Sequence, residues 1–156
     1  MQSKLKMTGF NHKVINVSVS GDTTRTGLNR LKPLLAKYHP DIVIVALGGN
    51  DGLRGLAFSE ITTSLGNIIL MTQQFKSKVL LAGVRLPPNY GAAYNSRFTA
   101  LFKTTADKFK IRLVPSLLSG IDDKTELMQP DKIHPKAQAQ SKIVDNVWQE
   151  LRFLLR

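Results

Sequence analysis

The sequence predicts an α/β protein built on a parallel sheet, and three observations support this fold class. Short stretches rich in β-branched residues alternate with longer stretches whose apolar residues recur at helical spacing. The stretch Ile42–Leu47 is apolar at every position, which is typical of a strand buried on both faces of a parallel sheet. Polar, glycine-containing loops follow the predicted strands. We therefore expect residues 1–156 to form a single domain with helices on both faces of the sheet.

The first predicted strand is Val14–Val19, which is rich in β-branched residues. The turn that follows contains Gly21, Asp22 and Thr23, and a threonine after a turn is a favourable helix N-cap. Leucines at helical spacing continue from there, and Pro33 predicts a kink or a restart of this helix.

The rest of the chain alternates in the same way. Strands are predicted at Ile42–Leu47, Val79–Val84 and Ile111–Pro115. Helices are predicted from about Phe58 to Phe75, in a stretch that ends at about Phe109, and at Ala137–Leu155. The inner face of the first of these helices is predicted to contain Ile61, Leu65, Ile68, Ile69 and Thr72.

Four polar loops should meet at one edge of the sheet, because the carboxyl ends of parallel strands lie together and ligands bind there. These loops are Gly21–Asp22, Gly48–Asp51, Arg85–Gly91 and Asp131–His134.

The composition excludes several classes of site. There is no cysteine, so disulfides, thiolate metal sites and a cysteine nucleophile are excluded. The net charge of +11 favours anionic partners, but the basic residues are scattered, which favours a dispersed surface charge over a nucleic-acid site. A nucleic-acid binder remains an alternative that rests on charge alone. No apolar run reaches the roughly 20 residues that span a bilayer, and the first residues do not form a signal peptide.

The strongest local signal for chemistry is Asp131-Lys132-Ile133-His134. An aspartate three residues before a histidine can orient the imidazole and stabilise its protonated form during base catalysis. By itself, this spacing also occurs in ordinary surface turns. We expect the other two histidines, His12 and His39, to be exposed to solvent.

Two further loops contain potential hydrogen-bond donors for a developing oxyanion. Asn50 lies in a glycine-rich loop after the apolar strand, and Gly21 offers a backbone N–H beside a predicted helix N-terminus. Each loop alone is equally compatible with a simple turn.

Taken together, these motifs resemble the SGNH, or GDSL, hydrolases, and most closely the bacterial thioesterase I/lysophospholipase and arylesterase subgroup. Four motifs occur in the family's order: Asn16–Thr23, Leu47–Gly55, Arg85–Gly91 and Asp131–Pro135. The resemblance implies a three-layer α/β/α, flavodoxin-like fold and hydrolysis of esters or thioesters through an acyl-enzyme, without metal or cofactor.

The resemblance also implies roles for individual residues. His134 would be the general base and then the general acid, and Asp131 would orient it. The Gly21 N–H and the Asn50 side chain would contribute to the oxyanion hole. The substrate loop would include Arg85, Pro87, Asn89 and Tyr90.

One departure from the family pattern concerns the nucleophile. Relatives carry it in a Gly-Asp-Ser motif after the first strand, upstream of the Gly21 motif, and the residues before Gly21 contain no such motif. We expect Met1–Asn11 to be the tail of the first helix, the central first strand and part of that helix to be missing, and the chain to be inactive as given. Ser20, beside Gly21, is the least implausible substitute nucleophile.

The predicted gap leaves three outcomes for the neighbouring strands. They close up and pair, they accept a strand from a partner, which includes a dimer formed through the exposed strand edges, or they leave the chain poorly soluble. The alternative function is a non-catalytic remnant that binds acyl chains or a partner. The expected substrates are small acyl esters or thioesters, with no nucleic acid and no stable membrane insertion. A full-length relative would be periplasmic or secreted.

Overall fold

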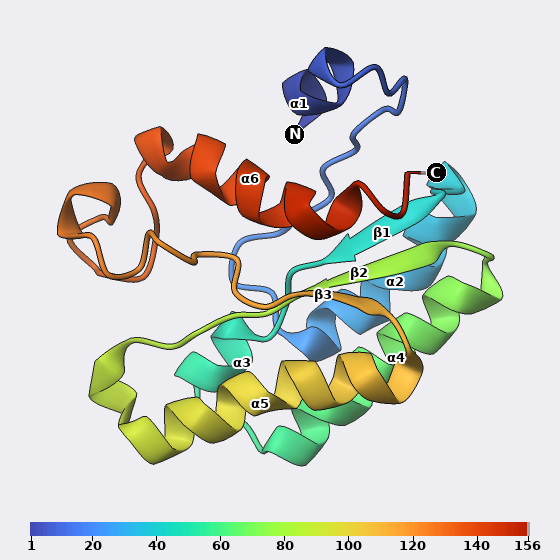
Figure 1. The fold of residues 1–156 in the computed structure, drawn as a ribbon. Helices are drawn as coiled ribbons and strands as arrows, with labels where there is room; N and C mark the ends of the chain where they lie inside the picture. Colours follow the sequence, from blue (N-terminus) through green and yellow to red (C-terminus); the bar gives the residue numbers. More distant parts are fainter. Residues whose placement is uncertain (156) are drawn as a thin grey trace.

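The computed structural model describes residues 1–155 and has the expected α/β architecture. Three parallel strands form the sheet in the order β1-β2-β3: β1 (Ile42–Val45), β2 (Lys78–Ala82) and β3 (Arg112–Val114). The main helices are α1 (Gln2–Met7), α2 (Thr24–Tyr38), α3 (Gly49–Leu53), α4 (Phe58–Gln74), α5 (Ala92–Phe109) and α6 (Gln140–Leu151). Figure 1 shows α6 on one face of the sheet and α2, α4 and α5 on the other, which gives three layers.

The larger core lies between the sheet and the helices α4 and α5. The predicted inner face of α4 is confirmed, because Ile61, Leu65, Ile68, Ile69 and Thr72 are all buried. Phe98 and Phe102 of α5 pack edge to face at 5.4 Å between ring centroids and fill the space beneath the strands. Helical apolar spacing in the sequence therefore identified the side chains of this core correctly.

The opposite face of the sheet is covered by α6 through Val147 and Leu151, which pack against Leu80 of β2. This helix is shorter than predicted: it ends at Leu151, and residues 137–139 form a 3₁₀ turn before it. A helix is present at the amino-terminal end, as predicted, and α1 reaches α6 through a salt bridge from Lys4 to Asp145.

The predicted strand at Val14–Val19 is wrong. These residues form an irregular extended segment, and no backbone hydrogen bond joins it to β1 within residues 1–155. Side chains take the place of a neighbouring strand: the Val14 N–H donates to Gln2 at 2.8 Å, and the Val17 carbonyl accepts from Arg30 at 2.7 Å. A strand needs a hydrogen-bonded neighbour, and the local sequence cannot supply one.

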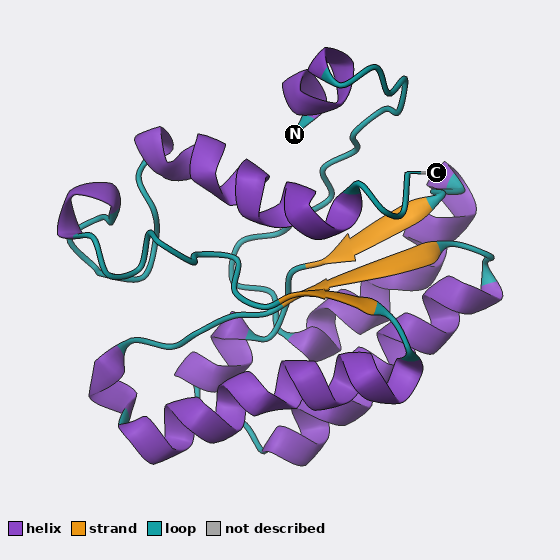
Figure 2. Cartoon of the chain, in the orientation of Figure 1, coloured by secondary structure: helices purple, strands orange, loops and turns teal. Residues whose placement is uncertain are grey.

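The strand β1 is consequently the edge of the sheet, which corrects the prediction that it is buried on both faces. It pairs with β2 alone. Although every residue of β1 is apolar, Ile44 is 40% exposed. By contrast, Leu80 and Leu81 of β2 are fully buried, because β2 has a neighbour on each side. Figure 2 shows the irregular segment as loop where a further strand was expected.

Two local predictions about α2 differ in outcome. The N-cap is a threonine, as predicted, but it is Thr23, the last residue of the predicted turn, which forms a reciprocal capping box with Thr26. Pro33 lies inside α2, which continues from Thr24 to Tyr38 without restarting.

The two histidines that were expected to be exposed differ. His39 is exposed, whereas His12 is half-buried and its Nδ1 atom has no hydrogen-bond partner among the described residues.

Candidate active site

The Gly21 turn connects the irregular segment to the capped start of α2. Gly21 has a φ of +81°, a backbone conformation that favours glycine, and the Asp22 N–H donates to the Val19 carbonyl at 3.3 Å. The Gly21 carbonyl accepts from Arg54 at 3.3 Å, whereas its N–H makes no hydrogen bond within residues 1–155. This N–H is therefore available to a ligand, as the oxyanion-hole prediction requires.

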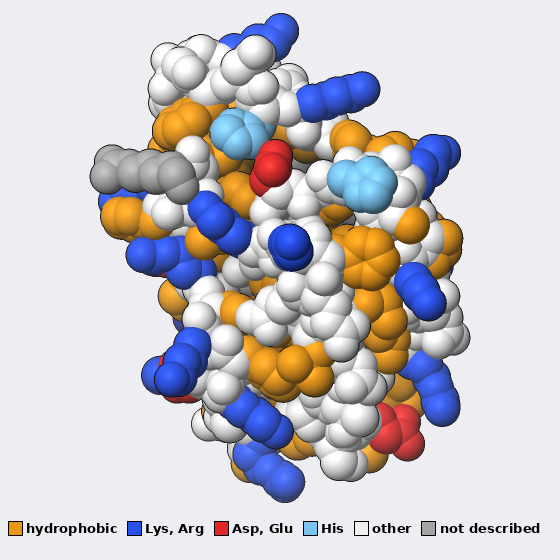
Figure 3. Space-filling view, turned by 90° about the vertical axis from the view of Figure 1, so that its right-hand side faces the viewer, with side chains coloured by type: hydrophobic (Ala, Val, Ile, Leu, Met, Phe, Trp, Pro, Cys, Tyr) orange, Lys and Arg blue, Asp and Glu red, His pale blue; other side chains and the backbone are white. Residues whose placement is uncertain are grey.

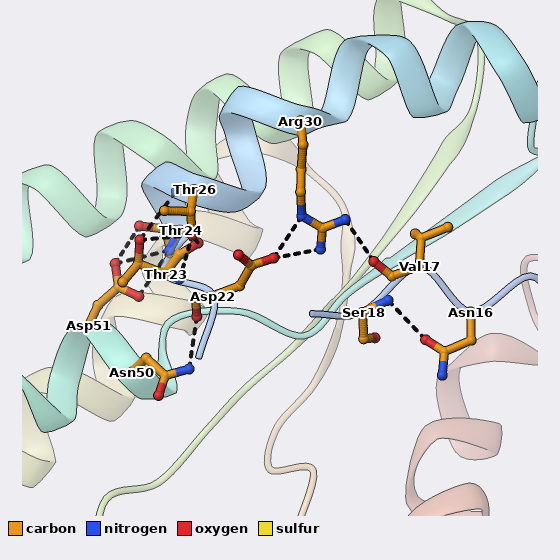
Figure 4. Close-up of polar contacts among 10 residues, drawn as sticks. All are labelled: Asn16, Val17, Ser18, Asp22, Thr23, Thr24, Thr26, Arg30, Asn50 and Asp51. Atoms are coloured by element: carbon orange, nitrogen blue, oxygen red, sulfur yellow. Dashed lines mark hydrogen bonds and ion pairs between the residues drawn. The ribbon is translucent and has the colours of Figure 1, made fainter. Parts of the chain in front are cut away.

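Asn50 lies in the short helix α3 rather than in an open loop. Its Nδ2 donates to the Asp22 carbonyl at 2.8 Å, which joins the two predicted oxyanion-hole elements (Figure 4). This bond fixes the orientation of the Asn50 amide and occupies one of its two N–H donors. The second N–H remains to bind an oxygen.

Asp51 holds the same turn from beneath, and the sequence argument did not assign it a role. Asp51 is 1% exposed, and its carboxylate accepts the Thr24 hydroxyl and a bifurcated hydrogen bond from the Thr24 backbone N–H. Its position beside Asn50, directly after an apolar strand, could have indicated this role. A carboxylate buried there without hydrogen-bond partners would destabilise the fold.

An ion pair supports the outer side of the turn. Arg30 of α2 contacts the Asp22 carboxylate at 2.6 Å and also donates to the Val17 carbonyl. Both side chains are at least two-thirds buried. The peptide carbonyl that accepts from Asn50 is thus held from two elements, α2 and α3.

The predicted dyad forms in the loop before α6. The Nδ1 atom of His134 lies 2.8 Å from Oδ2 of Asp131, and Oδ1 accepts the backbone N–H groups of His134 and Ile133 at 3.0 and 2.9 Å. These hydrogen bonds, those from His134 first, lower the pKa of Asp131 from 3.8 to about 2. An ionised Asp131 can only accept, so His134 donates to it through Nδ1, and Nε2 is the ring nitrogen that does not contact Asp131.

The predicted substrate loop, Arg85–Gly91, is anchored to α3. The Tyr90 hydroxyl donates to the Leu53 carbonyl at 3.0 Å, and the Pro87 carbonyl accepts from Asn95 at 3.1 Å. Asn89 is exposed, and Arg85 lies 4.0 Å from Asp122, at the limit of an ion pair. The loop is therefore connected at one end to the helix that carries Asn50 and at the other to the segment that leads to the dyad.

The structure thus joins Asn50 of α3 to the Gly21 turn through the Asp22 carbonyl and pairs Asp131 with His134. The two groups make no direct hydrogen bond to each other: the Gly21 turn and α3 lie where β1 ends, and the dyad lies in the loop between β3 and α6 (Figure 1). Within residues 1–155 no serine donates a hydrogen bond to His134, and no group of three potential metal ligands is present. None of the described helices is long and apolar enough to cross a bilayer.

The parallel sheet, the Gly21 turn held by Asn50 and the contact between Asp131 and His134 are consistent with a hydrolase of α/β architecture. The sequence profile of the GDSL-like lipase/acylhydrolase family matches residues 1–142, and the chain belongs to this family.

Individual relatives agree with the family assignment. Esterase TesA of Pseudomonas aeruginosa is 41% identical over 155 residues, which covers 99% of this chain and 77% of TesA. Thioesterase 1/protease 1/lysophospholipase L1 of Escherichia coli is 39% identical over 142 residues, with 91% of this chain and 68% of the relative covered.

Solved structures confirm the fold. The crystal structure of TesA has a TM-score of 0.96, with 41% identity, and covers 98% of this chain and 85% of its own. The psychrotrophic esterase EstA from Pseudoalteromonas has a TM-score of 0.91 at 33% identity, with 99% and 84% covered. The three-layer SGNH fold predicted from the motifs is therefore confirmed.

Proposed function

We propose that this chain carries the acid–base and oxyanion-binding parts of a serine-type ester or thioester hydrolase and is not active by itself. The observation that carries this proposal is the contact of 2.8 Å between His134 Nδ1 and Asp131, with Nε2 left free. In a complete site, Nε2 would take the proton of the attacking hydroxyl, and Asp131 would stabilise the imidazolium.

The oxyanion-binding role rests on the Gly21 turn. The free N–H of Gly21 and the second N–H of Asn50 are donors, and the bond from Asn50 to the Asp22 carbonyl holds them in one unit. Donors that are already oriented stabilise a developing negative charge without reorganisation during the reaction.

The proposed absence of activity follows from the side chains near His134. Its imidazole contacts Asp131, and no serine hydroxyl among the described residues hydrogen-bonds to it. Ser20 is exposed beside Gly21 and makes no hydrogen bond to the dyad. Without an aligned hydroxyl, no acyl-enzyme forms.

The substrate class is a small acyl ester or thioester. The support for it comes from the family and from relatives whose names include esterase, arylesterase and thioesterase. Tyr90, Pro87 and Asn89 would line the path of the acyl group, and Arg85 would lie at its entrance.

Butyrate, a product of short-chain ester hydrolysis, tests the oxyanion part of the proposal separately from turnover. We expect titration with butyrate to shift the backbone amide signal of Gly21 in an NMR spectrum, and Asn50→Ala to abolish that shift. Hydrolysis of p-nitrophenyl butyrate should be no faster than with His134→Ala. An unperturbed Gly21 amide would contradict the oxyanion-binding role. Turnover that depends on His134 would contradict the proposed absence of activity.

A further inference from the structure

Basic side chains gather at the edge of the sheet where the three parallel strands begin, here called the amino edge. The helices α2, α4 and α5 each end shortly before a strand, and the chain after α6 also reaches this edge, because Lys78 of β2 donates to the Leu154 carbonyl at 2.8 Å. Figure 3 views the amino edge and shows more basic than acidic side chains, with hydrophobic ones between them. The helix ends and strand starts at this edge carry seven lysines and arginines: Lys37, Lys76, Lys78, Lys108, Lys110, Arg112 and Arg152.

Three carboxylates lie at the amino edge and neutralise only part of this charge. Glu150 of α6 pairs with Arg112 at 2.7 Å, and Asp107 of α5 pairs at 2.6 Å with Lys103, one helical turn away. Asp41, directly before β1, makes no salt bridge within residues 1–155. With all three carboxylates counted, the amino edge keeps a net positive charge.

The charge is also unevenly distributed over the molecule. Six of the eleven carboxylates of the chain lie in the Gly21 turn, in α3 and in the segment between β3 and α6: Asp22, Asp51, Asp122, Asp123, Glu126 and Asp131. Five of the bases at the amino edge make no salt bridge within residues 1–155: Lys37, Lys76, Lys108, Lys110 and Arg152. Bases that are scattered along the sequence are thus brought together by the fold on a side with few carboxylates.

The turns that lead into the three strands each hold a basic residue in the left-handed region. His39, Lys76 and Lys110 follow α2, α4 and α5 and have φ values of +42°, +61° and +52°. Glycine is the usual residue in this conformation after a helix, because an L side chain adopts it at an energetic cost. The helix dipole favours a cation there, which accounts for the sign of the charge. It does not account for the use of a strained residue in all three turns.

Two exposed phenylalanines lie among these cations. Phe75 is the C-cap of α4, precedes Lys76 and is 37% exposed, and Phe153 is 44% exposed. The guanidinium groups of Arg112 and Arg152 lie over the Phe153 ring, at 4.2 and 4.8 Å from its centroid. The helix dipole gives no reason for exposed aromatic rings. Cations interspersed with exposed aromatic side chains are typical of surfaces that bind anionic membranes.

The contacts of Phe153 also disfavour a nucleic acid as the partner. Single-stranded nucleic acids bind by stacking their bases on aromatic rings, and the two guanidinium groups already lie over this ring. At a bilayer the same arrangement needs no rearrangement, because the ring enters the headgroup layer while the guanidinium groups contact lipid phosphates.

We propose that the amino edge docks on the surface of an anionic lipid bilayer, with Phe75 and Phe153 in the headgroup layer and the surrounding cations on the lipid phosphates. The Gly21 turn and α3 lie where β1 ends and would therefore face away from the bilayer (Figure 1). This inference concerns binding alone and does not depend on the proposed hydrolase chemistry.

Co-sedimentation of the full chain with lipid vesicles tests the proposal. We expect saturable binding to vesicles of phosphatidylcholine and phosphatidylglycerol that weakens as the salt concentration rises, and binding at least about tenfold weaker to phosphatidylcholine alone. Absence of binding, or equal binding to the two kinds of vesicle, overturns the proposal. Tighter binding to a short single-stranded DNA than to the anionic vesicles, at equal phosphate concentration, would assign the amino edge to nucleic acid and also overturn it.

Glycine substitutions test the location, because glycine removes a charge at these turns while it relieves the backbone. Lys76→Gly and Lys110→Gly should each weaken binding to the anionic vesicles by about fivefold without lowering the Tm. The matched control is Lys132→Gly in the dyad loop, since Lys132 is also left-handed, with a φ of +56°. It should change binding by less than about twofold, because its charge is screened at that distance. Equal losses in the three variants would show that binding follows net charge alone and would overturn the proposal.

Phe153→Ser tests the aromatic contribution without a change of charge. We expect it to weaken binding to the anionic vesicles by about fivefold, because the ring no longer enters the headgroup layer. Unchanged binding would contradict the proposed position of this ring.

Discussion

The two halves of the candidate site are built in opposite ways. The turn that contains Gly21 is held by Asn50 and Asp51, 27 or 28 residues away in the chain, through contacts that include a buried carboxylate. The dyad is formed within four residues, and the side chains of His134 and Asp131 are 67% and 43% exposed. Substitutions that disturb the Gly21 turn should therefore lower the free energy of unfolding, whereas substitutions in the dyad should have little effect on it.

The largest expected effect is from Asp51→Ala. The substitution leaves the backbone N–H and the hydroxyl of Thr24 buried without their acceptor. We expect the free energy of unfolding to fall by about 3 kcal/mol, measured by urea denaturation. A loss below about 1 kcal/mol would show that the turn does not depend on this carboxylate.

Gly52→Ala tests how tightly α3, which carries Asn50 and Asp51, packs against the core. An added Cβ would lie 2.6 Å from a ring carbon of Phe98, whose side chain is fully buried. Overpacking of this kind costs about 1–3 kcal/mol, and thermal unfolding would measure it. Gly49→Ala is the matched control in α3, because its nearest contact would be an ordinary 3.5 Å to Val84.

Arg30→Ala should have a smaller effect, about 1 kcal/mol, because its ion pair with Asp22 is only partly buried. A double-mutant cycle with Asp22→Asn would isolate the energy of the pair. If the two single substitutions were additive, the ion pair would not support the turn.

Asp131→Ala should shift the urea midpoint much less than Asp51→Ala, since both dyad side chains are exposed. A midpoint shifted as far as that of Asp51→Ala would show that the dyad is as strongly coupled to folding as the Gly21 turn.

Protonation of Asp131 should have the smallest effect on the stability of the whole protein. Because its pKa falls from 3.8 to about 2 in the folded chain, its carboxylate stabilises the loop above pH 3.8, and this contribution is lost as the pH falls through about 2. A carboxyl-carbon NMR titration should give a midpoint near 2 that rises towards 3.8 in His134→Ala. A midpoint near 3.8 in the unsubstituted chain would mean that the dyad contact does not form in solution.

The contact between Asp131 and His134 could be predicted from the sequence, because the two residues are only three positions apart and their spacing along the chain determines whether they can meet. The sequence also predicted the inner face of α4, since helical periodicity depends on neighbours along the chain. Gly21 and Asn50 were identified through motifs, and their hydrogen-bonded connection through Asp22 became visible only in three dimensions.

The predictions that failed depended on distant partners. Val14–Val19 has the composition of a strand, but strand formation requires a neighbour whose presence that segment cannot determine. Asp51 was not given a role, because its function depends on Thr24, which the fold brings beside it from 27 residues away. Because residues 14–19 do not pair with β1, one edge of β1 has no neighbouring strand and Ile44 is exposed.

In the proposed function, the chain holds the base and the oxyanion donors of an ester hydrolase without an aligned nucleophile of its own. Incubation of the full chain with a fluorophosphonate, followed by intact-mass measurement, tests this proposal directly. We expect no adduct beyond that found with His134→Ala. A stoichiometric serine adduct that is present in the unsubstituted chain and absent in His134→Ala would contradict it.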